Sequence, residues 1–453
     1  MTGSKHVLEV GRYRVLLDCG LFQGRRAESE RRNRNLPFDP STIDAVLLSH
    51  AHVDHCGSLP TLVKGGFRGT ILCTGATADL ADILLRDSAY VQKQDLEYLN
   101  RRRRKRGELA LEPVYTEDDV DRTVTMFERV AYGERVSVVP GVSAVFRDAG
   151  HILGSATIQV NARERGASRT VLFTGDLGRS GMPILRDPVT VREADVLVTE
   201  STYGARTHEP IDRIKNELAG FIRASVRRHG KVIVPSFAVG RTQRIVYELH
   251  GLMTDGSIPE VPVFVDSPLA VRATKIFREH AECYDEEMRE LLRRGDDPLG
   301  FSRVTYIQDV SESKKLNRLP GPAIIISASG MCEAGRVLHH LKNNITKRRN
   351  AVMIVGYQAE HTLGRRIANG EKRIRIFGQK YPMRARVAVF DEFSAHADRD
   401  ELLAFAEAIK RAPRRTIMVH GSEEAALSLG RLFTERGFAN VVVPLDGEVI
   451  ALD

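Results

Sequence analysis

Three histidines and one aspartate stand within six consecutive positions of this chain, in His50-Ala51-His52-Val53-Asp54-His55. They directly follow the apolar run at 45–48, which is typical of a buried strand. A strand that ends in such a cluster presents several metal ligands on one loop, because zinc accepts both imidazole and carboxylate ligands. The hexapeptide alone is also compatible with a solvated loop that carries several histidines by chance.

A metal site needs ligands from more than one segment, and three further segments each offer one. His151 stands between glycines, Asp176 follows the apolar run at 170–173, and His420 follows the apolar residues at 416–419. Each position looks like the end of a strand, where α/β proteins place their sites. A lone histidine at a strand end is more often a hydrogen-bonded structural residue, but the three segments together favour a metal site.

The elements that would position these ligands fall into three stretches. Residues 5–19 alternate like a hairpin, and residues 74–100 and 117–130 have helical spacing; strands are expected at 136–139, 142–147, 156–161 and 170–173. Between about 203 and 380 the chain repeats a plan of strand, turn and helix, with strands at 231–234, 263–265, 323–326 and 352–355. Such alternation predicts a parallel, doubly wound sheet.

After residue 385 the pattern returns to short strands and one helix at 399–411, followed by His420. The metal ligands therefore flank the repeated block. The simplest topology is one α/β domain inserted into another. We place the boundaries at 1–202, 203–383 and 384–453.

Composition sets further bounds. The 453 residues suffice for two or three domains, and 42% hydrophobic residues supply a sizeable core. A net charge of +8 favours a polyanionic partner without requiring one. The five cysteines show no C-x-x-C spacing and are expected to be buried or free thiols in a reducing compartment. No apolar run approaches the roughly 18 residues of a membrane span, so we expect a cytoplasmic protein that has no membrane partner.

The ordered motifs resemble those of the metallo-β-lactamase superfamily, and more narrowly those of its β-CASP nucleases. The resemblance extends over nearly the whole chain and is strongest to short prokaryotic homologues of the nuclease subunit of the cleavage and polyadenylation specificity factor. A first set of motifs is Asp18, the cluster at 50–55, His151 and Asp176; a second set, absent from other branches, is Glu200, His396 and His420. The resemblance implies an αββα sandwich with an inserted, doubly wound β-CASP domain.

The resemblance also implies roles at a centre of two zinc ions. One ion would be held by His50, His52 and His151, and the second by Asp54, His55 and His420, with Asp176 as the bridge. Two zinc ions about 3.5–4 Å apart can activate water and hold a phosphodiester for in-line attack. Manganese accepts similar ligands. Asp18 is interpreted as the acceptor of an imidazole N–H, or else as a carboxylate that only stabilises a turn.

By the same resemblance, Asp54, Glu200 and His396 are catalytic. His396 would protonate the departing 3′-oxygen, since histidine titrates near neutral pH, and Glu200 would keep it cationic and oriented. Alternatively, the pair only pins the two domains together. The expected products carry a 5′-phosphate and a 3′-hydroxyl, with endonuclease or 5′→3′ exonuclease cleavage both open. Family members that act on RNA carry histidine at the position of His420, whereas the DNA-repair branch has an apolar residue.

Several residues of the predicted inserted domain are expected to contact RNA. The turn at 327–331, with Ser327, Ser329 and Gly330, looks like a phosphate cradle, although such turns also serve packing alone. Ser236, Arg241 and Gly356 stand at equivalent turns and are expected to line the same groove. His361 replaces a glycine that is usual in the family, and it either touches RNA or fills space.

Residues 101–106 are all arginine or lysine. This basic run would attract a phosphate backbone, or it is a solvated helix end. The chain also begins almost at the turn Thr2-Gly3-Ser4, where the family usually has one more strand first, so we expect a misassigned start or a missing edge strand.

Three functions follow from these observations. The first is a zinc-dependent ribonuclease acting on single-stranded RNA, and the second is a catalytically silent RNA-binding subunit of a processing complex. The third, a small-molecule metallo-hydrolase, is disfavoured by the inserted domain and the basic charge. A homodimer is expected from the resemblance alone.

Overall fold

The computed structural model describes residues 3–24, 26–164, 166–390 and 393–452, so Thr2 of the predicted N-terminal turn lies outside the described residues. The chain forms two compact units, whose boundaries lie between residues 207 and 208 and between residues 395 and 396. The first unit combines Met1–Thr207 with His396–Asp453, and the second is His208–Ala395. No helix in the described ranges is both long and apolar enough to cross a membrane.

The first unit contains a five-stranded sheet in the order β1-β2-β3-β4-β5. Its strands are β1 (His6–Val10), β2 (Tyr13–Leu17), β3 (Ala45–Leu47), β4 (Thr70–Thr74) and β5 (Phe127–Val130). The hairpin of β1 and β2 is antiparallel, as predicted, and the other pairs are parallel. Three helices, α3 (Leu59–Lys64), α4 (Gly75–Arg104) and α5 (Glu117–Val124), accompany this sheet.

The helix predicted over 117–130 is wrong in its second half. The helix α5 begins with a capping box formed by Thr116 and Asp119, and it ends at Val124. Residues Phe127–Val130 then form β5, which pairs in parallel with β4. The pairing with a strand more than 50 residues earlier overrides the local helical spacing.

A seven-stranded sheet forms the other half of the first unit, in the order β20-β19-β10-β9-β8-β7-β6. Its strands are β6 (Arg135–Val139), β7 (Val142–Asp148), β8 (Ala156–Glu164), β9 (Ala167–Phe173), β10 (Val196–Glu200), β19 (Arg415–Val419) and β20 (Val441–Val442). Leu17 and Leu47 of the first sheet share one buried cluster with Phe146 and Phe173 of the second. The main core therefore lies between the two sheets.

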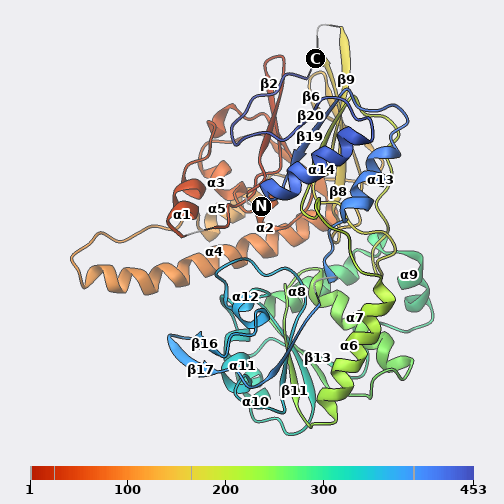
Figure 1. The fold of residues 1–453 in the computed structure, drawn as a ribbon. Coiled ribbons are helices and arrows are strands. Elements are labelled where there is room, and N and C mark those ends of the chain that lie inside the picture. The colour runs from red at the N-terminus through yellow and green to blue at the C-terminus, as the bar shows by residue number, and fades with distance from the viewer. Residues whose placement is uncertain (1–2, 25, 165, 391–392, 453) are drawn as a thin grey trace. The chain divides into compact units, whose positions relative to one another are not determined.

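Two helices, α13 (Arg399–Glu407) and α14 (Glu423–Glu435), cover the second sheet. Phe405 and Phe433 of these helices are buried against Leu172 and Leu197 of the sheet. Each buried side chain of this size stabilises the fold by roughly 1.5–3 kcal/mol. The layers are helices, sheet, sheet and helices (Figure 1), which confirms the αββα sandwich.

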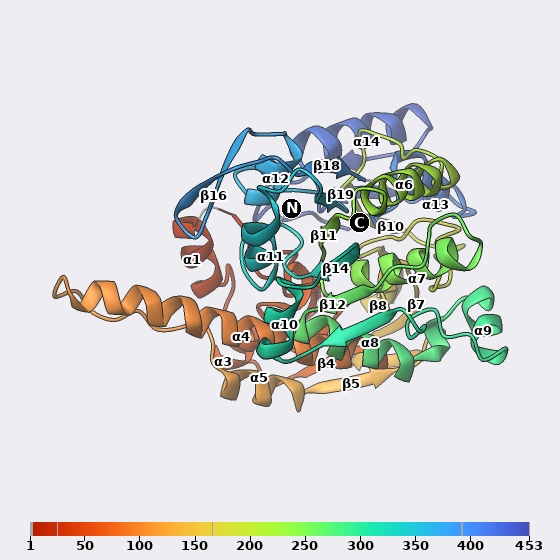
Figure 2. The ribbon, with the colours of Figure 1, turned by 90° about the horizontal axis from the view of Figure 1, so that it is seen from below.

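The second unit is built on six parallel strands in the order β13-β12-β14-β11-β15-β18 (Figure 2). They are β11 (Lys231–Pro235), β12 (Val263–Asp266), β13 (Val304–Ile307), β14 (Ala323–Ser327), β15 (Ala351–Ile354) and β18 (Arg386–Val389). Four of them, β11, β12, β14 and β15, are the strands predicted from the sequence. Their residues are almost all buried, as expected for a parallel sheet with helices on both faces.

The helices of this second unit complete the predicted doubly wound plan. They are α6 (Ile211–Val226), α7 (Arg241–Thr254), α8 (Pro268–Glu279), α9 (Glu286–Arg293), α10 (Val310–Leu316), α11 (Val337–Asn344) and α12 (Leu363–Ala368). An antiparallel hairpin of β16 (Arg373–Ile376) and β17 (Gln379–Pro382) is added to them.

The basic run at 101–106 lies at the end of α4, which is 30 residues long. Figures 1 and 2 both show the distal part of this helix projecting past the strands of its own unit. Arg101, Arg102 and Arg104 are exposed, whereas Arg103 pairs with Glu108 at 3.0 Å. Cations at a helix C-terminus interact favourably with the helix dipole, so the run stabilises the helix whether or not it binds RNA.

All five cysteines, Cys19, Cys56, Cys73, Cys283 and Cys332, are buried thiols. Burial raises the pKa of Cys19 to about 12, and it raises the pKa values of Cys56, Cys73 and Cys332 as well. A thiol that stays protonated is a poor nucleophile, so these side chains act as small apolar core residues.

Candidate metal centre

Strand ends of the first unit position every predicted metal ligand. His50 and His52 follow β3, and Asp54 and His55 belong to the short helix α2 (Val53–Cys56) directly after them. The other ligands follow strands of the second sheet: His151 after β7, Asp176 after β9 and His420 after β19. Loops at the strand ends of both sheets therefore carry the ligands, which lie together at one edge of the sandwich.

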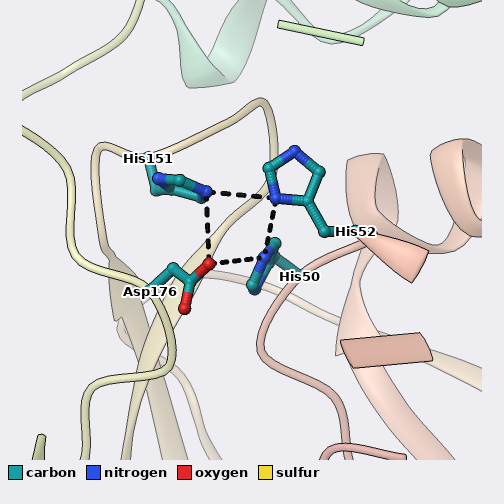
Figure 3. Close-up of side chains that lie close together, drawn as sticks. All are labelled: His50, His52, His151 and Asp176. Carbon is teal, nitrogen blue, oxygen red and sulfur yellow. Dashed lines mark hydrogen bonds and ion pairs between the residues drawn. The ribbon is translucent and has the colours of Figure 1, made fainter. Parts of the chain in front are cut away.

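Four side chains converge in a first group, drawn in Figure 3. His50 Nε2 lies 3.1 Å from His52 Nδ1, and His151 Nε2 lies 3.2 Å from the same His52 atom. Asp176 Oδ2 is 3.4 Å from His50 Nε2 and 3.5 Å from His151 Nε2. An imidazole nitrogen holds one proton or one lone pair, so His52 Nδ1 cannot form a hydrogen bond with both neighbours.

These distances fit a bound zinc ion. Tetrahedral zinc with bonds of about 2.0–2.1 Å holds its ligand atoms about 3.4 Å apart. The four donor atoms of His50, His52, His151 and Asp176 lie 3.1–3.5 Å apart along the contacts drawn in Figure 3. Nitrogen and oxygen donors of this kind suit zinc, and three of the four side chains are buried, while His52 is half-buried.

A second group contains Asp54, His55 and His420. His55 Nε2 lies 3.1 Å from His420 Nε2, which is 3.5 Å from Asp54 Oδ2. Asp176 connects the two groups, because its Oδ1 is 3.2 Å from His55 Nε2 and 3.1 Å from His420 Nδ1. The two oxygens of one carboxylate thus face different sets of histidines.

Burial keeps several of these imidazoles neutral. It lowers the pKa values of His50 and His151, and it lowers the pKa of His52 to about 3. The neutral ring is the form that coordinates a metal. His55 differs: burial opposes its charge, but the carboxylates of Asp176 and Asp18 outweigh this and raise its pKa well above the usual value.

Asp18 follows β2 and is fully buried beside His55. Its Oδ2 accepts a hydrogen bond from His55 Nδ1 at 2.7 Å, and its two oxygens accept from the Ser49 hydroxyl and amide at 2.8 and 2.7 Å. Its backbone is left-handed, with φ of +59°, which aspartate tolerates better than most residues. The contact keeps a proton on His55 Nδ1, so Nε2 is the nitrogen that faces the cluster.

Glu200 ends β10 and is fully buried. Its Oε1 accepts from the Leu177 amide at 2.6 Å, and its two oxygens lie 3.1 and 3.2 Å from His396 Nδ1. Burial opposes the cationic form of His396, but Glu200 and then Asp176 raise its pKa to about 9. Glu200 and His396 belong to the same compact unit, so their contact does not join the two units.

Backbone contacts fix His396 near the ligands. It forms an isolated β-bridge with Gly178, and the Ala397 amide donates to the Leu177 carbonyl at 2.7 Å. Gly178 itself permits close loop packing, since a β-carbon there would lie 2.0 Å from the Gly150 carbonyl oxygen. The loop that carries Asp176 can therefore lie directly against the loop that carries His151.

The six residues predicted to bind RNA lie at the carboxyl ends of three neighbouring strands of the second unit, β14, β11 and β15; they are Ser236, Arg241, Ser327, Ser329, Gly330 and Gly356. The Ser236 amide donates to the Ser327 carbonyl at 3.0 Å. The hydroxyls of Ser236 and Ser327 are buried and bond to the Phe237 and Asp266 carbonyls. These two hydroxyls therefore support the turns.

Two aromatic residues that the sequence interpretation did not select as site residues lie at the same turns. Phe237 directly follows Ser236, and Tyr357 directly follows Gly356; both rings are exposed. Their only sequence signal is an aromatic residue next to a turn already singled out. His361 is exposed and left-handed, with φ of +69°, so this loop keeps at residue 361 a conformation that glycine adopts more easily.

Comparisons with known proteins agree with this architecture. Family profiles match the chain as a metallo-beta-lactamase superfamily domain over 6–235, a Beta-Casp domain over 242–367 and a Zn-dependent metallo-hydrolase RNA specificity domain over 380–444. Ribonuclease TTHA0252 of Thermus thermophilus is 37% identical, with 96% of this chain and 94% of the relative covered.

Two archaeal relatives come from Methanocaldococcus jannaschii. An RNase J-like protein is 31% identical, with 98% of this chain and 96% of the relative covered. The transcription termination factor FttA is 30% identical, with 96% of this chain and 68% of that longer protein covered.

Proposed function

The chain belongs to the metallo-β-lactamase superfamily and, within it, to the β-CASP family, and from this premise we propose that it is a zinc-dependent ribonuclease. It hydrolyses phosphodiester bonds of single-stranded RNA, leaving 5′-phosphate and 3′-hydroxyl ends, and it cuts within the strand. Two relatives carry ribonuclease names, and one matching profile describes an RNA specificity domain, which supports this substrate.

One observation carries the proposal: Asp176 lies between two groups of histidines, with one carboxylate oxygen facing each. Oδ2 is 3.4 Å from His50 Nε2, and Oδ1 is 3.2 Å from His55 Nε2. A carboxylate so placed is suited to bridge two metal ions. A site for a single ion would need only one of the two groups.

We assign one zinc ion to His50, His52 and His151, the other to Asp54, His55 and His420, and the bridge to Asp176. Bound zinc supplies Lewis-acid chemistry, because it lowers the pKa of water toward neutrality and draws negative charge from a phosphoryl group. Manganese could occupy the same ligands.

The chain's own residues handle the protons. Asp18 holds the His55 tautomer that turns Nε2 toward the metal site. Glu200 holds His396 through Nδ1 and favours the cationic form of that ring. His396 then donates a proton to the 3′-oxygen as it departs, so that a neutral hydroxyl leaves rather than an alkoxide.

The test compares zinc-loaded protein with its His396→Ala variant on a 5′-labelled single-stranded RNA, on DNA of the same sequence and on a circular RNA. His229→Asn serves as a matched control, because His229 is an exposed histidine of the second unit. We expect cleavage of both RNAs, with a loss of about 10²- to 10⁴-fold in His396→Ala and none in the control. Zinc content, measured by mass spectrometry, should stay near two per chain.

Three outcomes would count against the proposal. Fully metallated protein that cuts no RNA would indicate a silent RNA-binding subunit instead. A cyclic phosphate product would exclude attack by water on the phosphodiester. Cleavage of linear but not circular RNA would indicate an exonuclease instead of an endonuclease, and immediate release of the 5′ label as a mononucleotide would give the 5′→3′ direction.

A further inference from the structure

Three turns of the second unit meet because their strands are neighbours in the parallel sheet. The strands β14, β11 and β15 are adjacent, and in parallel strands the carboxyl ends lie at one edge. Register pairs Ile233 with Val352, so Phe237 and Tyr357 follow the carboxyl ends of two adjacent strands.

A buried glutamine ties two of these turns together. Gln358 is only 4% exposed, and its Nε2 lies 3.1 Å from the Gly330 carbonyl, 3.2 Å from that of Gly356 and 3.1 Å from that of Tyr357. The Gly364 amide adds a bond to the Met331 carbonyl at 3.0 Å. The backbone around Tyr357 is therefore held in place before any ligand arrives.

Two aromatic rings are exposed on this fixed backbone. Phe237 is 40% exposed and Tyr357 is 41% exposed. The Phe237 ring lies against Gly330, where a β-carbon would come within 2.9 Å of its Cδ2 atom. A single exposed ring is ordinary in a soluble protein, but two at adjacent strand ends form a surface that suits flat apolar ligands.

One guanidinium group lies over the Tyr357 ring, and a second lies against the backbone of Gly356 next to it. The Arg365 guanidinium is 5.6 Å from the centre of the Tyr357 ring. Arg241 lies against Gly356, where a β-carbon would be 3.2 Å from its Nη1 atom, so any larger residue at 356 would crowd the guanidinium. Guanidinium groups bind phosphate oxygens in a bidentate manner.

Exposed aromatic rings next to cationic groups, on a rigid backbone, are the pattern by which proteins bind unpaired nucleotides. We propose that Phe237 and Tyr357 form a base-stacking platform for single-stranded RNA, with Arg241 and Arg365 holding the adjoining phosphate. This inference rests on the proposed function. It adds a selection step, because a base within a duplex cannot reach the rings, whereas any unpaired base can.

The experiment measures binding, so that it is independent of turnover. Metal-loaded protein carrying His396→Ala, which preserves the RNA, is titrated against fluorescent oligoadenylate and against an abasic oligomer of equal length. Phe237→Leu and Tyr357→Leu are added to this background. Tyr90→Leu is the matched control, since Tyr90 is a 55% exposed ring on α4.

We expect Phe237→Leu and Tyr357→Leu each to weaken oligoadenylate binding between about 5- and 150-fold, the range for loss of one stacked base. The abasic oligomer should bind all variants equally, and Tyr357→Phe should restore wild-type affinity. Unchanged oligoadenylate binding in both leucine variants would overturn the proposal. An equal loss on the abasic oligomer would overturn it too, because the defect would then not involve bases.

The outcomes separate this inference from the proposed function. If the protein cuts no RNA but the base-dependent loss appears, the platform stands and the ribonuclease proposal fails. If RNA is cut but the leucine variants bind like the parent, the ribonuclease stands and the platform fails.

Discussion

Asp18 determines which nitrogen of His55 faces the metal site. Its carboxylate accepts a hydrogen bond from His55 Nδ1 at 2.7 Å, and two hydrogen bonds from Ser49 hold that carboxylate in place. A carboxylate acceptor also makes the ring a stronger donor to a metal. The geometry favours this role over that of a carboxylate which only stabilises a turn.

Replacement of Asp18 by asparagine should therefore weaken zinc binding by about 10- to 100-fold at neutral pH. The asparagine amide would present N–H groups to the His55 Nδ1 proton, which disfavours the tautomer that coordinates. Affinity is measured by competition with a chromophoric chelator. The control is Asp44→Asn, an exposed aspartate whose carboxylate accepts the Arg14 amide. Equal affinity in Asp18→Asn and wild type would reduce Asp18 to a turn residue.

Residue types and order were enough to predict the cluster, because His50, His52, Asp54 and His55 are local in sequence and their chemistry is distinctive. Residue types alone could not predict which ligands lie together in each of the two groups; that assignment came from the family resemblance. That the two Asp176 oxygens face different histidines depends on how strands of two sheets end at one edge, which no local pattern encodes. Phe237 and Tyr357 were missed for the same reason, since each is ordinary when taken alone.

At the scale of elements, one buried carboxylate joins the end of β12 to its neighbours. Asp266 Oδ2 is 2.6 Å from both His340 Nε2 of α11 and the Ser313 hydroxyl of α10, and Oδ1 accepts from Arg336 at 2.7 Å. Burial alone would raise its pKa, but these donors outweigh it and lower the pKa below the usual carboxyl value. The charged form is therefore the one that stabilises the folded unit.

The stability that Asp266 contributes is fully present above the unfolded pKa of about 3.9, and it is lost as pH falls toward the lower folded value. Asp266→Asn should lower the unfolding free energy by about 3–5 kcal/mol at pH 7, because it leaves buried donors without a charged partner. This deficit should shrink as pH falls below about 3.9. Denaturant unfolding at several pH values, against Asp255→Asn as an exposed control, measures it. A deficit independent of pH would contradict the assignment.

The helix α4 carries its cations at its distal end, where Arg101, Arg102 and Arg104 are exposed. Replacing these three and Lys105 by alanine should weaken RNA binding and flatten its dependence on salt, by about 0.7 in log–log slope for each phosphate that the variant no longer neutralises. Substituting lysine for each arginine keeps the charge and is the matched control. An unchanged slope in the alanine variant would show that the basic run does not contact RNA and serves only to stabilise the end of the helix.

Element boundaries were the weakest part of the sequence interpretation, and α5 shows why. Helical spacing continued through residue 130, yet the chain leaves the helix at Val124 to add β5 to a sheet edge. In contrast, β11, β12, β14 and β15 were predictable, because long apolar runs followed by small-residue turns have few alternative structures.

At the scale of the whole molecule, all proposed metal ligands belong to one compact unit, which two separate stretches of the chain complete. The second unit has its own buried core, and none of these proposed ligands lies in it. The sequence predicted such an insertion, with domain boundaries after residues 202 and 383; the boundaries between the compact units lie after residues 207 and 395. The second unit extends past residue 383 because β18 (Arg386–Val389) pairs in parallel with β15 of its sheet.

Chelation should therefore destabilise the two units unequally. A ligand that binds only the folded state contributes about 4 kcal/mol when its concentration is 1,000 times its dissociation constant. Removal of zinc should accelerate amide exchange around β3 and β19, while amides of β11 and β14 keep their protection. Hydrogen exchange followed by mass spectrometry measures both regions in one sample. Equal acceleration in both units would show that the metal stabilises more than the unit that holds it.

The buried thiols offer a way to measure the rate at which each of the two units opens after zinc is removed. Cys19, Cys56 and Cys73 report from the first unit, and Cys283 and Cys332 report from the second. A protonated, inaccessible thiol reacts with an alkylating reagent only when its surroundings open. The rate of labelling at each cysteine therefore reports the rate of local opening around it. Because both units contain cysteines, no engineered probe is needed.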